Sequence, residues 1–390
     1  MVFVKFICML NSYVEVVDSW DGWLQLEPYW NTLVESSQYP SIYSSFEFLT
    51  IAWKHYHSKK SRPLILLIKD SNSHALIGIA PFRIETFRWF NMSLQACEYL
   101  VTNDVDKPYI IPLKGEDERC WLAVGKYMVN KASSWDLVEL MEIRDGLAYK
   151  SFQSCFNLPR FHSKVAEDSS GLLIDLTESW DDFYRGHKKF RKKLRVLEGK
   201  LNDGFTFEYT KDEAEAQQAL ERYIELEANS WKHGKIGVSR DEKHLGFYRE
   251  LIPLLAAKGQ VHFGFLASGN NTLSGEIAYS FADQVYFCHG TFDQKYAEFS
   301  PGKVSTGLFI GELTGKEFTQ GDFLCGFANY MNPWSTGLVK TSSLFIYKIS
   351  PKILYVFSIL ALFKILRPIK NSLLRMKKWL VERKGTLREG

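Results

Sequence analysis

Residues 285–326, VYFCHGTFDQKYAEFSPGKVSTGLFIGELTGKEFTQGDFLCG, decide the fold. The segment opens with a β-rich run, continues in a helical pattern from Phe299 to Phe318, and ends in the short run DFLCG. A strand, a helix and a second strand in this order form a crossover unit whose strands pair in parallel. We therefore expect a sheet to change from antiparallel to parallel pairing within these residues.

The chain before this unit predicts an antiparallel meander. Three β-rich runs, VHFGFLA, GEIAYSF and VYFCHGTF, are separated by the turn segments SGNNTL and ADQ. Two helical segments, 179–201 and 212–231, precede the meander. The first helix carries an apolar stripe on one face: Phe190, Leu194, Leu197 and Leu201. A strand, GLLIDL from Gly171, opens this second unit of the chain.

The first half of the chain has a similar order of elements. MVFVKFICML reads as a first strand, and RPLILLIK and ALIGIAPFRI read as two strands joined by the turn DSNSH. The aromatic residues occur at spacings that are compatible with helices: Trp30, Phe46, Phe48 and Trp53. This half is therefore mixed α/β as well, although no repeat of residue identity relates the halves.

Composition narrows the class of protein. With 390 residues, 46% of them apolar, the chain can build about two or three domains. The formal charge of +3 gives no global field for nucleic acid. The cysteines form no C-x-x-C pair, which disfavours a zinc site and favours a reducing cytosol. Walker, dinucleotide-binding, H-E-x-x-H and G-x-S-x-G motifs are absent from the sequence.

The triplet Ser300-Pro301-Gly302 predicts an anion site. Serine suits a helix N-cap, proline suits the first turn, and glycine permits close approach of a ligand. The amides of a helix N-terminus favour a pyrophosphate, and Lys303 adds a point charge. A pyrophosphate of CoA fits this site, which extends to Val304; a simple capping turn is the alternative.

Four stretches resemble successive signatures of the CelD/BioF2-like acetyltransferase domain: FRKKLRVLEGKL, EANSWKHG, YFCHGTFDQKYAEFSPGKV and DFLCGFANYMNPW. The resemblance covers about residues 170–335. It implies a fold of the CoA-dependent N-acetyltransferase (GNAT) superfamily, related to the Fem-type transferases in which two such folds are fused. Residues 10–165 are then a degenerate first copy. Where such proteins carry an acidic residue and a Tyr-Lys pair, this chain has Phe327, Ala328, Asn329, Tyr330 and Met331.

We accordingly predict a tandem GNAT-like fold with acetyl-CoA or another acyl-CoA as co-substrate and no metal. The predicted parts are a degenerate GNAT-like domain (1–168), a GNAT-like acetyltransferase domain (169–338) and a basic amphipathic helical tail (339–390).

Acyl transfer from a thioester needs a base, donors for the oxyanion and an acid for the thiolate. The sequence offers Asp322 as the base, Tyr330 as the acid, and His289 as a further titrating group. A turn-capping aspartate, a packed histidine and a core tyrosine are the structural alternatives.

Substrate contacts are expected from Trp231, Lys232 and Trp334. An aromatic platform beside a cation suits a sugar or an acidic acceptor, and Trp334 would form a wall of the pocket. A core tryptophan and a lysine at a helix C-terminus are the alternatives.

Two basic stretches complete the pattern. The run from His187 to Arg195 suits phosphates of a nucleotide-linked substrate, of tRNA or of anionic lipid, or is a solvated helix face. Near the C-terminus, lysines and arginines interleave with apolar residues as in an interfacial helix, which suits peripheral contact with an anionic membrane; a helix packed on the second domain is the alternative. The apolar core 353–363 is too short to span a bilayer. A cytoplasmic protein at the inner face of the membrane is expected.

The sequence therefore predicts an enzyme that moves an acetyl or acyl group from acyl-CoA to an amine or hydroxyl of a saccharide, a small molecule, or a cell-envelope or exopolysaccharide precursor. A Fem-like transferase that uses aminoacyl-tRNA is one alternative. A non-catalytic polysaccharide-assembly protein of the same fold is another.

Overall fold

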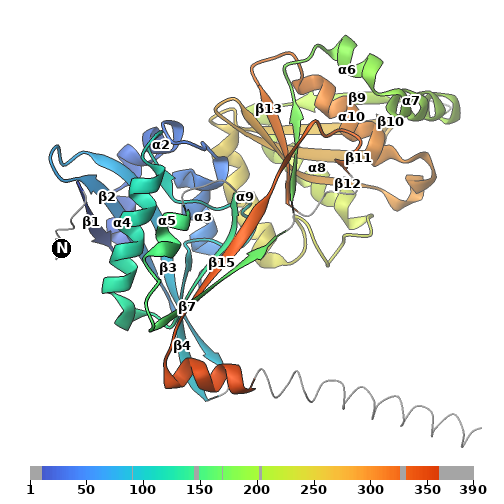
Figure 1. The fold of residues 1–390 in the computed structure, drawn as a ribbon. Coiled ribbons are helices and arrows are strands. Elements are labelled where there is room, and N and C mark those ends of the chain that lie inside the picture. Colours follow the sequence, from blue (N-terminus) through green and yellow to red (C-terminus); the bar gives the residue numbers. More distant parts are fainter. Residues whose placement is uncertain are drawn as a thin grey trace, which may run out of the picture.

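The computed structural model describes residues 11–89, 91–144, 149–168, 170–201, 204–325 and 331–359. Within them, helices flank two mixed sheets that lie at opposite ends of the molecule (Figure 1). The prediction of a mixed α/β fold in two units is confirmed.

The first unit contains eight strands. They are β1 (Ser12–Val17), β2 (Ser61–Asp70), β3 (Leu76–Trp89), β4 (Met92–Tyr99), β5 (Ile111–Pro112), β6 (Leu137–Arg144), β7 (Phe161–Glu167) and β15 (Thr341–Lys348). Its helices are α1 (Trp20–Leu24), α2 (Glu27–Glu35), α3 (Phe46–Tyr56), α4 (Asp117–Asn130) and α5 (Tyr149–Ser154), with short 3-10 turns η1 (Ile42–Ser44) and η2 (Ala132–Ser134). The sheet order is β1-β2-β3-β4-β6-β15-β7, with β5 beside β3, and only β4 and β6 pair in parallel.

Strand β15 corrects the expected helical tail from residue 339. After β14 (Gly337–Val339) in the second sheet, the chain crosses back and inserts β15 between β6 and β7 of the first sheet. Leu344 and Ile346 are fully buried in the core of the first unit. This alternation of buried residues is a strand pattern, and the contacts that bury them come from residues about 200 positions earlier.

The second unit contains the predicted meander. Its remaining strands are β8 (Gly171–Asp175), β9 (Thr206–Thr210), β10 (Val261–Ser268), β11 (Asn271–Phe281), β12 (Gln284–Phe292) and β13 (Gln320–Cys325). The helices are α6 (Trp180–Gly186), α7 (Lys188–Lys200), α8 (Glu213–Ala228), α9 (Glu242–Ala256) and α10 (Pro301–Leu313), with the 3-10 turn η3 (Gln294–Phe299). The sheet order is β14-β8-β13-β12-β11-β10-β9. Strands β10, β11 and β12 are antiparallel, whereas β12 and β13 are parallel, so the predicted change of pairing is confirmed.

The predicted helix 179–201 is two helices. The chain leaves the helical conformation at His187 (φ −98°, ψ 67°), between α6 and α7. In α7, Phe190, Leu194 and Leu197 form the buried face, as predicted, and pack into the core of the second unit.

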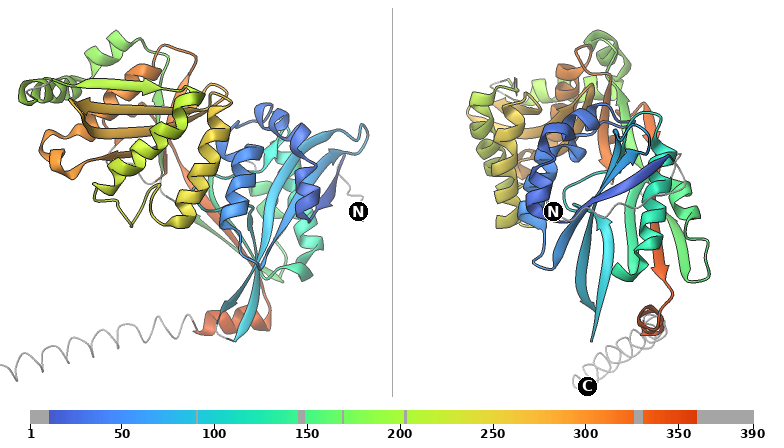
Figure 2. Two further views of the ribbon diagram at one scale, coloured as in Figure 1. Left: turned by 180° about the vertical axis from the view of Figure 1, so that it is seen from behind. Right: turned by 90° about the vertical axis from the view of Figure 1, so that its left-hand side faces the viewer.

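A shared hydrophobic core joins the two units. Helices α3 and α9 lie side by side in Figures 1 and 2, and Phe48 meets Phe247 there with ring centroids 5.6 Å apart. Tyr43 of the first unit likewise meets Tyr286 of β12 at 5.4 Å. Because one cluster of buried residues contains side chains from both units, the halves fold against each other.

Three predictions fall outside the described residues: the first strand, the role of Tyr330 as the acid, and the tail beyond residue 359. Residues 351–359 are helical. Across the described part of the chain, every helix is too short or too polar to cross a bilayer.

Candidate active site

The two parallel strands of the crossover unit pair over only part of their length, and the unpaired end of β12 lines the candidate site. Strands β12 and β13 pair only from Gln284 and Gln320 to Tyr286 and Asp322. Beyond this point β12 borders a cavity of about 330 Å³. A cavity of this size is typical of small-molecule sites. It extends from Gly302, at the start of α10, to the loop after α8.

Glu276 of β11 is the buried acid of this cavity. Its carboxylate accepts a hydrogen bond from Thr306 Oγ1 at 2.9 Å, and burial raises the pKa of Glu276 to about 8. The carboxyl group lies against Gly290 of β12, where a Cβ atom would be only 2.4 Å from Glu276 Oε2. Glycine at position 290 therefore makes room for this carboxyl group. Glu276 was not predicted as a site residue, although it is a lone acid inside the apolar run GEIAYSF.

Lys232 reaches the same part of β12. Its ammonium donates a hydrogen bond to the carbonyl oxygen of Gly290 at 2.5 Å. Burial lowers the pKa of Lys232, and the nearby acids Glu227 and Glu276 only partly oppose this. Trp231 is half-exposed and also lines the cavity. Two of the three residues predicted to contact substrate, Trp231 and Lys232, therefore border the cavity.

His289 lies on the wall of the cavity, and its ring contacts the hydroxyl group of a buried tyrosine. Its Nε2 atom is 2.9 Å from the hydroxyl oxygen of Tyr248. Burial, assisted by the charge of Lys232, lowers the pKa of His289 to about 3. The imidazole is therefore neutral at physiological pH.

Helix α10 starts at the predicted position, but Ser300 does not cap it with its side chain as predicted. Ser300 occupies the N-cap in the left-handed conformation (φ 53°), and its hydroxyl makes no capping bond to the helix. Instead it accepts a hydrogen bond from Lys193 of α7 at 3.1 Å. Burial and the charge of Lys303 lower the pKa of Lys193. Two cations thus converge on a helix N-terminus.

The other residues of this motif divide between cavity and core. Pro301 fills the first helical position, Gly302 lines the cavity and Lys303 is exposed. Val304 is fully buried in the core of the second unit, so its side chain supports the helix and is remote from solvent.

Asp322 and Trp334 lie elsewhere than expected. Asp322 is on β13, but its carboxylate is bound by Lys107 of the first unit at 3.1 Å and does not border the cavity. Trp334, expected to form a wall of the pocket, packs in the core instead, stacked on Phe183 with centroids 5.8 Å apart. Its large apolar surface is satisfied by other aromatic rings. Tyr330 lies outside the described residues.

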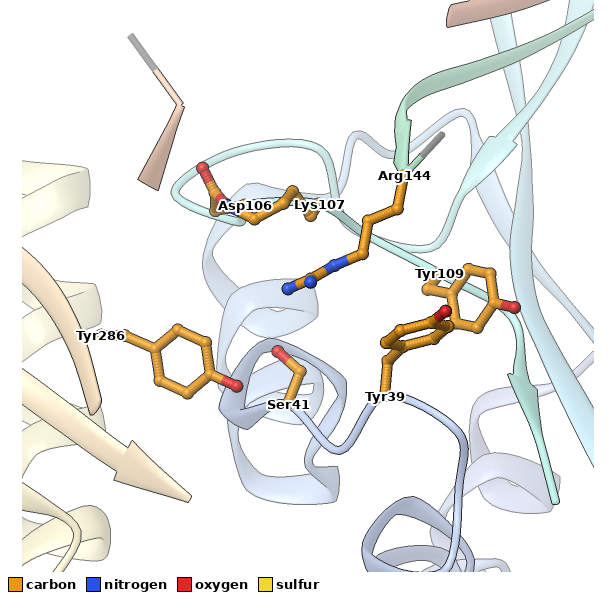
Figure 3. A pocket seen from close by; sticks show the side chains of 7 residues that line it. All are labelled: Tyr39, Ser41, Asp106, Lys107, Tyr109, Arg144 and Tyr286. Carbon is orange, nitrogen blue, oxygen red and sulfur yellow. The ribbon is translucent and has the colours of Figure 1, made fainter. Parts of the chain in front are cut away.

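A second crevice lies where the two units meet. Figure 3 shows Arg144 extending into it between Tyr286 and Tyr39. Its volume is about 10 Å³, which is room for a single water. The larger cavity beside β12 is therefore the candidate active site.

The comparisons agree with this geometry. Residues 185–331 match the family described as "Acetyltransferase (GNAT) domain". The solved structure of FemX has a TM-score of 0.56 at 9% identity, over 85% of this chain and 98% of that chain. A conserved protein of unknown function from Bacteroides thetaiotaomicron VPI-5482 has a TM-score of 0.50 at 9% identity, over 83% and 97%. No curated protein sequence matches this chain.

Such low identities establish the fold alone. The family match covers both β12 and α10, which form the cavity, and the likeness to FemX extends over both units. Residues 185–331 therefore match a GNAT acetyltransferase domain, and the chain as a whole shares the fold of FemX.

Proposed function

We propose that this chain transfers an acyl group from acyl-CoA to an amine or hydroxyl of a saccharide, as in a cell-envelope or exopolysaccharide precursor. The observation that carries the proposal is the cavity beside the unpaired end of β12, which joins a cationic helix N-terminus at Gly302 to the buried acid Glu276. The resemblance to CelD/BioF2-like domains supports the saccharide class of acceptor.

The donor's phosphates bind at the start of α10. The N-terminal amides of the helix and the cations Lys193 and Lys303 favour a pyrophosphate there. The thiol-bearing arm of CoA then follows the edge of β12, which has no ladder pair with β13 beyond Tyr286. This path brings the thioester into the cavity.

Glu276 acts as the general base and then as the general acid. A nitrogen or oxygen of the acceptor attacks the thioester carbonyl, and the Glu276 carboxylate accepts the proton that the nucleophile loses. When the carbon–sulfur bond breaks, the same proton passes to the departing thiolate. A pKa of about 8 lies close to the operating pH, where general acid–base catalysis is most efficient.

Calorimetric titration with acetyl-CoA and with CoA tests the donor site. The Gly302→Trp variant places a large side chain at the proposed phosphate seat and should abolish binding. Gly186→Trp is the matched control, because Gly186 is exposed and a Cβ atom added there meets nothing within 4 Å. Binding by wild type and Gly186→Trp, but not by Gly302→Trp, supports the proposal. Failure of wild type to bind either ligand contradicts it.

A second candidate is transfer of an aminoacyl group from tRNA. The exposed side chains of Lys188, Lys189, Lys192 and Arg195 form a basic face on α7 beside Ser300. Binding of aminoacyl-tRNA that is lost in Lys192→Glu/Arg195→Glu, without any CoA binding, would favour this candidate. Binding of polysaccharide alone would favour a non-catalytic assembly protein.

A further inference from the structure

The helix at 351–359 presents apolar side chains to solvent. Leu354 is 57% exposed, Tyr355 48% and Phe357 39%, and Ile349 just before the helix is 48% exposed. Ile353 is buried at 3%. The helix is therefore apolar on its inner face and also on its outer face, which is unlike an ordinary surface helix.

Contacts with the first unit fix which face points outward. Lys352 Nζ donates a hydrogen bond to Asp136 Oδ2 at 2.9 Å, and the same oxygen accepts the backbone N–H of Gln95. The rings of Tyr347 and Phe357 meet at 5.1 Å. In Figure 1 the helix lies at the far end of the first sheet, near β4 and away from the second sheet. The described residues thus hold the helix at an extremity of the molecule with Leu354 exposed.

The charge of the adjoining sequence identifies what covers this face. From Ile349 to Val381 the sequence contains seven lysines or arginines and no aspartate or glutamate. The seven are Lys352, Lys364, Arg367, Lys370, Arg375, Lys377 and Lys378. Apolar residues interleave with them throughout. This composition is complementary to a surface that is apolar inside and anionic at its boundary.

We propose that the helix 351–359 and the basic sequence after it dock on an anionic lipid bilayer. The side chain of Leu354 and the exposed part of Phe357, whose ring also contacts Tyr347, enter the boundary between headgroups and acyl chains, while the cations pair with the headgroups. A second copy of the chain fits this face less well, because two copies would bring their cationic segments together. Docking in this way holds the molecule at a membrane surface.

Flotation of the full-length protein with lipid vesicles tests the proposal. The protein should float with vesicles of phosphatidylcholine and phosphatidylglycerol, and not with phosphatidylcholine alone. Binding should weaken as salt rises. The Leu354→Glu/Phe357→Glu variant should lose about tenfold or more in partitioning, because both side chains leave the lipid. The matched control, Leu24→Glu/Tyr29→Glu, changes two equally exposed apolar residues at another place and should float like wild type.

Three results would overturn the proposal: no flotation of wild type with anionic vesicles, equal flotation with neutral ones, or unchanged flotation of Leu354→Glu/Phe357→Glu. Light scattering provides a further check. A wild-type dimer that this variant converts to a monomer would assign the face to a second copy. Binding of CoA by the variant should equal that of wild type, so a failure here is distinguishable from a failure of the proposed activity.

Discussion

Lys107 of the first unit and Asp322 of the second lie 3.1 Å apart, Nζ to Oδ1, and both side chains are almost fully buried. Lys107 also contacts Asp106. Burial by itself lowers the pKa of Lys107, but the two carboxylates outweigh it and raise the pKa, so the ammonium stays charged. Lys107 and Leu324 both have positive φ angles, 46° and 63°. Strained backbone at a buried ion pair indicates that the surrounding structure enforces this junction.

Removal of one partner of this pair should destabilise the whole chain. Lys107→Met leaves the buried Asp322 carboxylate with only the more distant cation Arg144, 3.6 Å away, and Asp322→Asn leaves Lys107 with one carboxylate fewer. We expect each change to cost about 3–5 kcal/mol of unfolding free energy in urea titrations. The double variant should cost less than the sum, because the two residues interact directly.

A surface ion pair is the control. Lys54 pairs with Glu250, but its side chain is 59% exposed. Lys54→Met should cost under about 1 kcal/mol. Strict additivity of the Lys107 and Asp322 changes would show that the buried contact is energetically unimportant.

The pH profile of acyl transfer should report Glu276. As a base it works only when deprotonated, and burial raises its pKa to about 8. The rate at subsaturating substrate should therefore rise with pH and level off above about pH 8. In Glu276→Gln we expect a loss of about a hundredfold or more and no inflection near pH 8. An inflection that persists in this variant would assign the titration to another group.

Local sequence patterns were sufficient for the crossover unit and the meander. Strands β10 to β12 and helix α10 follow from alternation, turn residues and the motif at Ser300, all of which act over a few neighbouring positions. The buried face of α7, with Phe190 and Leu194, was readable for the same reason.

Long-range contacts explain what the sequence did not reveal. The insertion of β15 between β6 and β7, and the pairing of Lys107 with Asp322, join residues about 200 positions apart. A tryptophan is as suitable for a pocket wall as for a core. That Trp334 belongs to the core follows only from its contact with Phe183. Glu276 became a candidate only when the structure enclosed it and placed Gly290 opposite.

Gly290→Ala should displace the carboxyl group of Glu276 while leaving its chemical identity unchanged. The added Cβ would lie 2.4 Å from Glu276 Oε2, so the carboxyl group must move. We expect a decrease in transfer rate together with a loss of about 1–3 kcal/mol in unfolding free energy. Gly199→Ala on α7 is the matched control, since its Cβ meets nothing within 4 Å. That change should be neutral or stabilising by up to about 1 kcal/mol. Full activity and stability of Gly290→Ala would mean that the position of Glu276 is not constrained.

Glu227 should act as a positioning residue for the loop that carries Trp231 and Lys232. Fully buried at the end of α8, its carboxylate accepts hydrogen bonds from the backbone N–H groups of Val238 and Ser239, at 3.3 and 2.7 Å. Glu227→Ala removes both acceptors and frees the loop at the cavity mouth. We expect the KM for the acceptor to rise about tenfold or more, because tenfold is about 1.4 kcal/mol, near the low end for one lost hydrogen bond to a charged group.

Two further measurements separate positioning from general instability. Amide hydrogen exchange should accelerate within residues 231–239 of Glu227→Ala, while CoA affinity at α10 stays at the wild-type value. Glu225→Ala is the control, because Glu225 is exposed on the same helix and should leave both KM and exchange unchanged. If Glu227→Ala instead lowers kcat and CoA affinity together and leaves exchange in the loop unaltered, then the carboxylate supports the fold of the whole unit and does not position Lys232.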